Sequence, residues 1–325
     1  MATSKKKTRV DLEIDETLEK SYKNGDDCIE MDDDEGAAHS SSSEGSDMED
    51  DDSEMEVTEK VNVEFEARNP EEADFHGIRQ LLLQLFLKSN IDISAITDWI
   101  LTQRYVGSVI KQYLDDGDDD EDESSMEEDV NQVYGVITCL NITKYKDKPC
   151  TDQIKKHLLQ KLANSKSSAN QLQAILENPS NNIGWLINER FVNIPAQIAV
   201  PSFQSIRQEM NTANQKGEDY HCSHYIMVAK KFRMKTLPKP GKKRISKKPL
   251  ESEIYSNGEE EFFAEAAEFR ATFTVAEERD SGVVQQWDSE LEDQYEPLRE
   301  IIVIKANELE NIMIKVENVL SQTNS

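Results

Sequence analysis

The stretch PLREIIVIKANELENIMIKVENVL, residues 297–320, places two kinds of hydrophobic pattern next to each other. Its first part is a nearly continuous apolar run rich in isoleucine and valine, which is typical of a buried β-strand. Its second part spaces the apolar residues at helical intervals and predicts a helix with one face in the core. A strand that leads directly into a helix indicates an α/β or α+β domain.

The same mixture of strands and helices continues upstream. Further strands are predicted at 61–68, 105–114, 132–143, 184–193, 220–232 and near the end of 259–275. Helices are predicted at 75–89 with Asp74 as the cap, at 93–103, 150–164 and 169–178, from about Pro201 to 214, and at 307–322. Because the elements alternate without an internal repeat, we expect an α/β (α+β) domain with a single mixed sheet flanked by helices.

The charge of the chain is concentrated in two acidic runs. The formal net charge is −28 over 325 residues, and residues 26–56 and 115–129 hold 26 of the acids and none of the bases. The rest of the chain therefore has a net charge of only −2. Such runs repel themselves and act as solvated interaction segments.

Domain boundaries follow from these runs. Residues 1–56 are predicted to form a disordered acidic tail, and residues 57–325 a single domain with an acidic insertion at 115–129 and a basic loop at 235–249. The sequence holds no apolar run of membrane-spanning length and no secretory signal at its N-terminus. Four cysteines in a chain of this length favour a reducing compartment over a disulfide framework.

The tetrapeptide HCSH, residues 221–224, looks like the start of a metal site or a nucleophile with its base. Strand alternation would place Cys222 and His224 on one face and His221 on the other. The other candidate ligands, Cys139, Cys150, His76 and His157, are scattered singly through the sequence. A structural zinc site needs four ligands, so we interpret 220–232 as a core strand.

A basic cluster is the most specific short signal. About ten bases lie between residues 230 and 248, and prolines keep the segment KPGKKRISKKP extended. The nuclear-import candidates are Lys242, Lys243, Arg244, Lys247 and Lys248. Two alternatives stay open, internal pairing with the acidic insertion and nucleic-acid binding, although no aromatic side chain is interleaved to stack a base.

Two resemblances to ligand-binding loops fail on spacing. The acidic insertion places glycine third instead of sixth, which does not fit a calcium loop. QRYVGSV resembles the pyrophosphate turn of acetyl-coenzyme-A enzymes at Arg104 and Gly107, but Val109 stands where that turn needs glycine or alanine. We therefore expect neither a metal nor a cofactor.

Three long blocks resemble the BCCIP family, which is named for interaction with a breast-cancer susceptibility protein and a cyclin-dependent-kinase inhibitor. They are DFHGIRQLLLQLFLKSNIDISAITDWILTQRYVGSVIKQ, NERFVNIPAQIAVP and NGEEEFFAEAAEFRATFTV. The resemblance implies an acetyltransferase-like architecture without a working cofactor site. It also implies a non-enzymatic nuclear adaptor and chaperone with no catalytic residues to carry over.

The implied roles are homologous-recombination repair, cell-cycle control, spindle organisation, nuclear export and escort of a basic large-subunit ribosomal protein. The implied partners are that ribosomal protein, a recombination-repair protein, a cyclin-dependent-kinase inhibitor and an import receptor, bound by a monomer that uses neither membrane nor sequence-specific nucleic acid. The implied location is the nucleus, with shuttling to the cytoplasm and a spindle-pole population. The alternative is an acetyltransferase-like enzyme that uses acetyl-coenzyme A.

The acidic insertion is the predicted client-binding segment. Its residues would speed the approach of a basic client, while apolar contacts on the domain would fix the client's identity. The candidates are Asp115, Asp116, Asp118, Asp119, Asp120, Glu121, Asp122 and Glu123.

Overall fold

The computed structural model describes most of the chain downstream of residue 60. The described residues are 9–14, 61–103, 105–113, 132–191, 194–234, 253–278 and 295–323. The chain divides into two compact units, residues 1–10 with 64–325, and residues 11–63. Strand β1 (Arg9–Ile14) and the first strand after residue 60 each have residues in both units, and the description below concerns the larger one.

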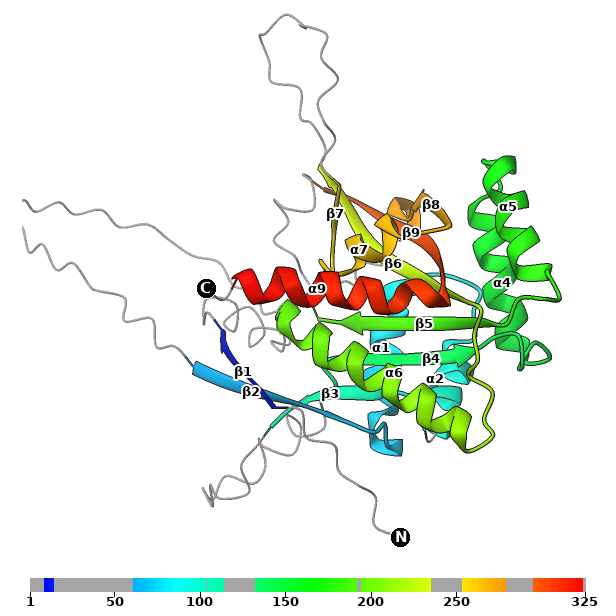
Figure 1. Cartoon of the computed structure of the whole chain (residues 1–325). Helices are drawn as coiled ribbons and strands as arrows, with labels where there is room; N and C mark the ends of the chain where they lie inside the picture. Colours follow the sequence, from blue (N-terminus) through cyan, green and yellow to red (C-terminus); the bar gives the residue numbers. More distant parts are fainter. Residues whose placement is uncertain are drawn as a thin grey trace, which may run out of the picture. The chain divides into compact units, whose positions relative to one another are not determined.

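One mixed sheet runs through the larger unit (Figure 1). Its strands are β2 (Val61–Arg68), β3 (Ser108–Gln112), β4 (Gly135–Asn141), β5 (Ile183–Arg190), β6 (His224–Met234), β7 (Glu253–Tyr255), β8 (Phe269–Thr274) and β9 (Tyr295–Lys305). They follow the order β2-β3-β4-β5-β6-β9-β8, and β7 pairs with β6. Among these pairs, β5 and β6 run parallel and the others run antiparallel.

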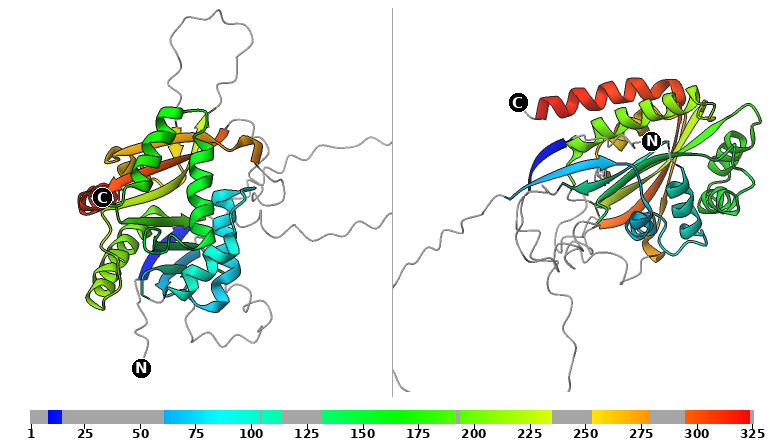
Figure 2. Two further views of the ribbon diagram at one scale, coloured as in Figure 1. Left: turned by 90° about the vertical axis from the view of Figure 1, so that its right-hand side faces the viewer. Right: turned by 90° about the horizontal axis from the view of Figure 1, so that it is seen from below.

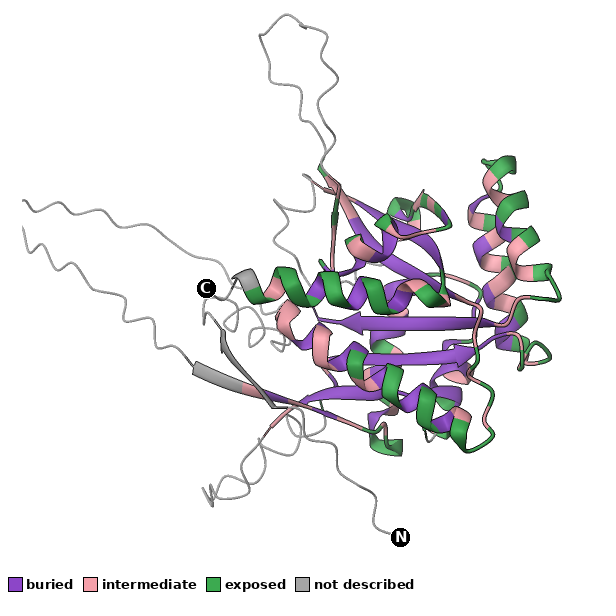
Figure 3. Ribbon diagram, in the orientation of Figure 1, coloured by how far each residue is buried: buried purple, intermediate pink, exposed green. Residues whose placement is uncertain are grey.

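Helices cover both faces of the sheet. They are α1 (Phe75–Phe86), α2 (Ile93–Thr102), α4 (Pro149–Lys161), α5 (Lys166–Glu177), α6 (Ala199–Gln215), α7 (Glu260–Glu265) and α9 (Leu309–Thr323). Figure 2 shows α6 and α9 on one side of the strands, and α1, α2, α4 and α5 on the other. This three-layer arrangement explains why the central strands are buried along their whole length (Figure 3).

The core on the α6–α9 side combines aromatic, aliphatic and methionine side chains. Phe203 of α6 packs on Phe263 of α7 with ring centroids 5.2 Å apart, and both are 1% exposed. Strand residues such as Leu186 and Ile302 contribute to the same cluster. The apolar stripe of α9, which includes Ile312, therefore closes the core as its helical spacing predicts.

The core on the other side centres on aromatic rings. Phe86 of α1 stacks edge-on against Trp185 of β5 at 5.7 Å and against His157 of α4 at 5.9 Å. Arg299 of β9 joins this layer to the sheet, because its guanidinium donates to the carbonyl oxygens of Leu85 (2.9 Å) and Gln84 (2.7 Å). These carbonyls lie in the last turn of α1, where a cation is favoured by the helix dipole.

The predicted mixed sheet flanked by helices is confirmed, and most elements lie within a few residues of their predicted limits. Asp74 is the N-cap residue of α1, as predicted, but the expected capping bond from its side chain is absent. The chain enters α1 through a 3₁₀ turn at Glu72–Asp74, and the Asp74 carboxylate makes no capping bond to α1. It is buried, accepts the Glu71 amide (2.9 Å) and pairs with Lys111 Nζ at 2.5 Å.

The antiparallel pairing of the strands on either side of the acidic insertion is confirmed, whereas the insertion itself lies outside the described residues. Of the predicted disordered tail, Arg9–Ile14 is described and forms strand β1, so the expectation of disorder is wrong for these residues, and the rest of the tail lies outside the described part of the chain. The acetyltransferase-like architecture and the domain boundary at residue 57 stay predictions. Within the described part of the chain, no helix has the length and apolar character needed to cross a membrane.

Candidate functional site

The parallel strands β5 and β6 pair only briefly. Ile183–Trp185 of β5 lies opposite His224–Ile226 of β6, and beyond these residues the two strands separate. Ligands of α/β proteins commonly bind in the crevice at the carboxyl ends of such strands. The region where β5 and β6 separate is therefore the candidate ligand-binding crevice of this sheet.

The chain itself fills this region. The Ser256 amide donates to the Lys230 carbonyl of β6 at 2.9 Å, and the Asn257 side-chain amide donates to the Asn188 carbonyl of β5 at 3.0 Å. The two residues thus satisfy backbone groups that each strand would otherwise leave unpaired. We call residues 256–260 the plug, because they occupy the crevice that a cofactor would need.

A buried charge cluster lies beneath the plug. Arg190 of β5 makes a bidentate ion pair with Glu259, with Nη2 to Oε2 at 2.8 Å, and both side chains are at most 5% exposed. Asn188 donates to Glu259 at 2.9 Å and to Glu260 at 3.2 Å, and Asn257 donates to Glu260 at 2.9 Å. The cluster therefore binds the plug to β5.

The two carboxyls of this cluster have opposite protonation preferences. Burial opposes ionisation of Glu259, but the charge and hydrogen bonds of Arg190 outweigh it and lower the pKa of Glu259 below its usual value. Burial raises the pKa of Glu260 well above its usual value, and the negative charges of Glu259 and Glu189 raise it further. Glu259 is thus the counter-ion of Arg190, and Glu260 favours the neutral acid.

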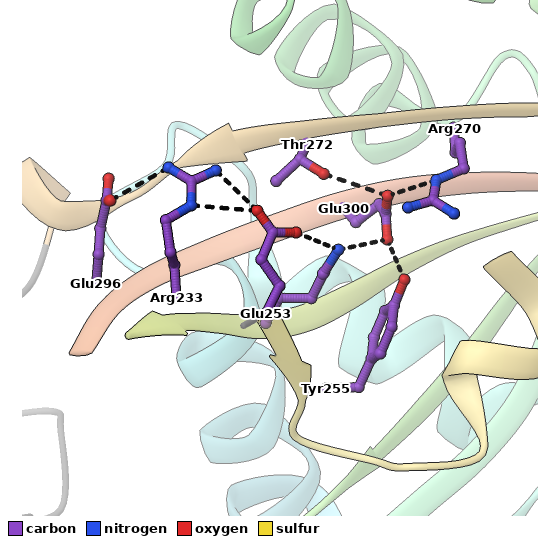
Figure 4. A network of polar contacts seen from close by, with 8 residues as sticks. Arg233, Glu253, Tyr255, Arg270, Thr272, Glu296 and Glu300 are labelled. Carbon is purple, nitrogen blue, oxygen red and sulfur yellow. Dashed lines mark hydrogen bonds and ion pairs between the residues drawn. The ribbon is translucent and has the colours of Figure 1, made fainter. Parts of the chain in front are cut away.

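A second network surrounds Glu300 of β9, which is 1% exposed (Figure 4). Its carboxylate accepts from Arg270 Nε at 3.0 Å and Thr272 Oγ1 at 3.2 Å, both from β8, and from the Tyr255 hydroxyl of β7. Lys231 Nζ of β6 lies 3.2 Å away. Glu300 therefore ties four strands together through one carboxylate. Burial, and then the bond to Glu300, raise the pKa of Tyr255 far above its usual value.

Glu253 extends this network to the start of β7. It pairs with Lys231 Nζ at 2.7 Å and with Arg233 Nη2 at 2.8 Å, and Arg233 also reaches Glu296 at 3.4 Å (Figure 4). Burial would raise the pKa of Glu253, but the bonds from Lys231 and Arg233 lower it overall. The network fixes the last residues of β6 against the first of β7, between which the basic loop is inserted.

The turn that resembles a pyrophosphate loop is also occupied by the protein. Arg104 lies outside the described residues, whereas Gly107 has a φ of 129° and its amide donates to Glu209 Oε2 of α6 at 2.7 Å. A carboxylate at this amide takes the place of a phosphate oxygen and repels any other anion. Both the valine at position 109 and the bond between Glu209 and the Gly107 amide argue against a pyrophosphate site at this turn.

HCSH is divided between a loop and a strand. Strand β6 begins at His224, so alternation does not extend back through Cys222, and the expected shared face of Cys222 and His224 is wrong. His224 Nδ1 lies 2.8 Å from Ser223 Oγ, and Nε2 lies 3.2 Å from Glu268. The interpretation as a core strand is confirmed from Tyr225 to Lys231, which are all buried.

Cys222 instead lies beside Cys139, a pairing that sequence spacing could not reveal. A Cβ added at Gly184 would come within 2.6 Å of Cys139 Sγ and 2.9 Å of Cys222 Sγ, so both sulfurs occupy the space above this glycine. The hydrogen bond with Cys222, together with burial, raises the pKa of the Cys139 thiol. Within the described ranges, no group of three or more histidines, cysteines and acids could hold a metal ion.

The predicted site residues lie outside the described part of the chain. These are the import candidates Lys242, Lys243, Arg244, Lys247 and Lys248 and the acidic candidates between Asp115 and Glu123. The described residues do fix where both segments attach. Gly135 pairs with Arg190 and Met234 pairs with Tyr295, so the start of β4 and the ends of β5 and β6 share one edge of the sheet. We call this the carboxyl edge.

Comparisons with known proteins point to one family. The BCCIP family profile matches residues 60–263. "BRCA2 and CDKN1A-interacting protein" of Bos taurus is 33% identical over 270 residues, which cover 82% of this chain and 85% of the relative. "Protein BCCIP homolog" of Drosophila melanogaster is 33% identical over 266 residues (81% and 86%), and that of Xenopus tropicalis is 36% identical over 262 residues (80% and 83%).

A solved structure has the same fold. The crystal structure of BCP1 from Saccharomyces cerevisiae is similar to this chain with a TM-score of 0.51 at 16% identity, over 82% of this chain and 93% of that chain. At this identity the likeness shows the fold alone. The bovine relative is named for its interaction with BRCA2 and CDKN1A.

Proposed function

The chain belongs to the BCCIP family, and from that membership we propose that it is a partner-binding adaptor that escorts a basic client protein. The client class is the basic large-subunit ribosomal protein that the family resemblance implies. Binding to a recombination-repair protein and to a cyclin-dependent-kinase inhibitor is the second part of the proposal. Relatives whose names record interaction with BRCA2 and CDKN1A support that part.

One observation supports the escort function: the strands that flank the acidic insertion, β3 and β4, end and begin at the carboxyl edge. They pair antiparallel, and the Tyr134 amide donates to the Ile110 carbonyl at 2.8 Å, so the described residues on either side of the insertion lie side by side. The insertion carries 11 acids and no base between residues 115 and 129. A dense negative charge that starts from this edge would raise the association rate of a basic protein by about 10- to 1,000-fold at low salt.

The ion pairs of the described domain are consistent with attraction by the acidic segments and recognition by the domain surface. Arg190, Lys231 and Arg233 are bound by acids of the domain itself, so these three bases are already paired in the described structure. This favours recognition of a client at the surface and by the charged segments. The shape of the sheet and its helices would fix which client is retained.

The first experiment mixes the full chain with purified large-subunit ribosomal proteins at 0.1 and 0.5 M salt. We expect one basic protein to be retained near 1:1 at both salt concentrations. Its association rate is then measured for a variant in which the eight acids from Asp115 to Glu123 become Asn or Gln. Neutralisation should slow association at least 10-fold at 0.1 M salt, because screening has not yet removed the attraction.

A matched control neutralises acids that lie elsewhere, by Asp152→Asn and Glu177→Gln. This control should associate at the wild-type rate, because its acids are isolated and not part of a run. An unchanged rate in the eight-acid variant would refute the electrostatic part of the proposal. Retention of none of the ribosomal proteins would refute the client class.

The enzymatic alternative makes a different prediction. An acetyl-coenzyme-A enzyme would gain about 2.7 kcal/mol at a ligand concentration of 100 times Kd, which raises Tm by several degrees. We expect no shift with acetyl-coenzyme A, because the plug fills the crevice between β5 and β6 and Glu209 holds the Gly107 amide. A reproducible rise in Tm would favour the alternative.

Nuclear location is part of the proposal, with the basic cluster as the import signal. Import receptors bind extended lysine-rich segments, and Lys242, Lys243, Arg244, Lys247 and Lys248 supply one. Replacing these five residues by alanine in a fluorescently tagged chain should move the protein to the cytoplasm. The same variant should still bind its client, and unchanged nuclear accumulation would exclude this role.

A further inference from the structure

Strand β8 forms an end of the sheet. It pairs with β9 on one side, and no other strand in the described part of the chain pairs with its second side (Figure 1). The backbone of an edge strand offers a row of unpaired N–H and C=O groups to any extended chain that reaches it.

The register identifies the outward groups. Thr274 lies opposite Leu298, and the Val275 amide donates to the Pro297 carbonyl at 3.2 Å. In an antiparallel ladder, alternate residues bond to the partner strand, so Phe273 and Ala271 also face β9. The N–H and C=O groups of Arg270, Thr272 and Thr274 consequently face away from the sheet.

The outward positions lack the usual protection of an edge strand. Arg270, Thr272 and Thr274 are all exposed, and no proline or lysine interrupts the segment Phe269–Thr274. The one charge in the strand is held on the sheet, because Arg270 Nε donates to buried Glu300 at 3.0 Å. Thr272 Oγ1 is bound to the same carboxylate. No strand in the described part of the chain covers this edge, although helix α5 lies close to β8, and the side chains of Arg270 and Thr272 are held by Glu300.

The surroundings of this edge are strongly acidic. Exposed acids flank β8 at both ends, with Glu265 and Glu268 before the strand and Glu277 after it. Glu265 has a basic neighbour, Lys315 Nζ at 3.5 Å, and Glu268 lies 3.2 Å from His224 Nε2, so neither carboxylate is buried in an ion pair. A basic segment would therefore be attracted to this edge, and an acidic one or a nucleic-acid backbone would be repelled.

We propose that β8 binds an extended basic segment of the client as an additional strand. The inference rests on the proposed escort function and names its docking mode. The outward N–H and C=O groups of Arg270, Thr272 and Thr274 would bond to the client backbone, which gives affinity without sequence specificity. Lysine or arginine side chains of the client would reach Glu265, Glu268 and Glu277, which selects for charge.

Two other occupants fit less well. A second copy of the chain would bring its own Glu268 and Glu277 against the same acids, so pairing of two β8 strands is opposed by like charge. The chain's own basic segment, residues 235–252, begins and ends on β6 and β7, and β9 separates β6 from β8. A basic segment of a client has the required charge and is not attached to β6 and β7.

Amide hydrogen exchange on the full ¹⁵N-labelled chain tests the proposal. The probe is an eight-residue peptide of alternating lysine and valine. In the free protein, the amides of Arg270, Thr272 and Thr274 should exchange fast, whereas those of Ala271 and Phe273 exchange slowly. At saturating peptide, exchange at the three outward amides should slow at least 10-fold.

Control peptides and variants isolate strand addition from simple charge attraction. A peptide N-methylated at two adjacent central residues has both edges blocked and should not protect the three amides, and a glutamate–valine peptide should not bind. Thr274→Pro should abolish protection, because it removes an outward donor and leaves the ladder to β9 intact. Thr274→Val should keep it.

Each outcome decides the proposal. Fast exchange of Arg270, Thr272 and Thr274 at saturating peptide overturns it, and so does equal protection by the methylated peptide. Slow exchange in the free protein would show that the chain fills its own edge, which also overturns it. If Thr274→Pro fails to fold, the methylated peptide still decides. A client that binds at 1:1 without protecting these amides would refute strand addition and leave the escort function standing.

Discussion

The buried ion pair of Arg190 and Glu259 allows a direct test of what holds the plug in the crevice between β5 and β6. Glu259→Gln keeps the shape of the side chain and removes its charge. The guanidinium of Arg190 is then left buried without its counter-ion. Breaking a buried pair in this way typically costs about 3–5 kcal/mol, which is a large part of the total stability of a domain.

Glu260, next to Glu259, determines how much stability Glu259→Gln should lose within this range. The charge of Glu259 contributes to the raised pKa of Glu260, so its removal allows Glu260 to ionise more readily. Ionised Glu260 would compensate Arg190 in part. We therefore expect Glu259→Gln to lose about 3 kcal/mol at pH 7, and Glu259→Gln combined with Glu260→Gln to approach about 5 kcal/mol.

Urea unfolding monitored by tryptophan fluorescence measures these differences, since Trp185 is buried in the sheet. A loss of about 3 kcal/mol corresponds to a fall in Tm of roughly 6–12 °C for a domain of this size. Replacing both Arg190 and Glu259 by methionine should restore stability to within about 2 kcal/mol of wild type, because no buried charge then lacks a partner.

An exposed pair provides the control. Lys156 and Asp152 lie 2.7 Å apart on α4 with side chains 68% and 56% exposed, so Asp152→Asn should change stability by at most about 0.5 kcal/mol. If Glu259→Gln also stays within about 1 kcal/mol of wild type, the pair does not stabilise the plug. The ion pair would then not be what holds the plug in the crevice between β5 and β6.

Three further predictions concern single positions. Gly184→Ala should destabilise the fold by about 1–3 kcal/mol in thermal unfolding, because its Cβ would lie 2.6 Å from Cys139 Sγ and 2.9 Å from Cys222 Sγ. Adding Cys222→Ala removes the second of these contacts and should recover part of the loss. An unchanged stability of Gly184→Ala would contradict this packing. The folded state holds the Glu260 proton more tightly than the unfolded chain does, because its pKa is raised, so folding loses stability as pH rises above the unfolded-state pKa of about 4.3. Glu260→Gln should therefore be more stable than wild type at pH 7.5 and equal to it near pH 4, and a pH-independent difference would sink this account. Burial lowers the pKa of His157 to about 4, so its ring resonances in an NMR titration should move near pH 4 and not near pH 6.5.

The amino-acid sequence determined the elements and their class. Apolar runs and helical spacings located the strands and helices to within a few residues, as at 61–68 and in the strand and helix after residue 297, because burial of one face is a local property of the pattern. Charge runs are likewise visible without a fold. The resemblance at three long blocks was enough to indicate the family.

The sequence was less able to place side chains at the ends of elements. Asp74 has the residue type of a helix cap, yet the preceding 3₁₀ turn places its carboxylate against Lys111. HCSH looked like alternating strand residues, but the strand begins only at His224. Residues that precede a strand do not follow its alternation, so the pattern could not predict the orientation of Cys222.

Only the tertiary structure decided which distant residues meet. Arg190 and Glu259, or Glu300 and Tyr255, are far apart in sequence, and nothing in their spacing distinguishes them from other charged residues. Their contact follows from the separation of β5 and β6, which opens a crevice that the plug then fills. The edge position of β8 has the same origin, because the order of strands in a sheet is set by long-range pairing and not by the local pattern.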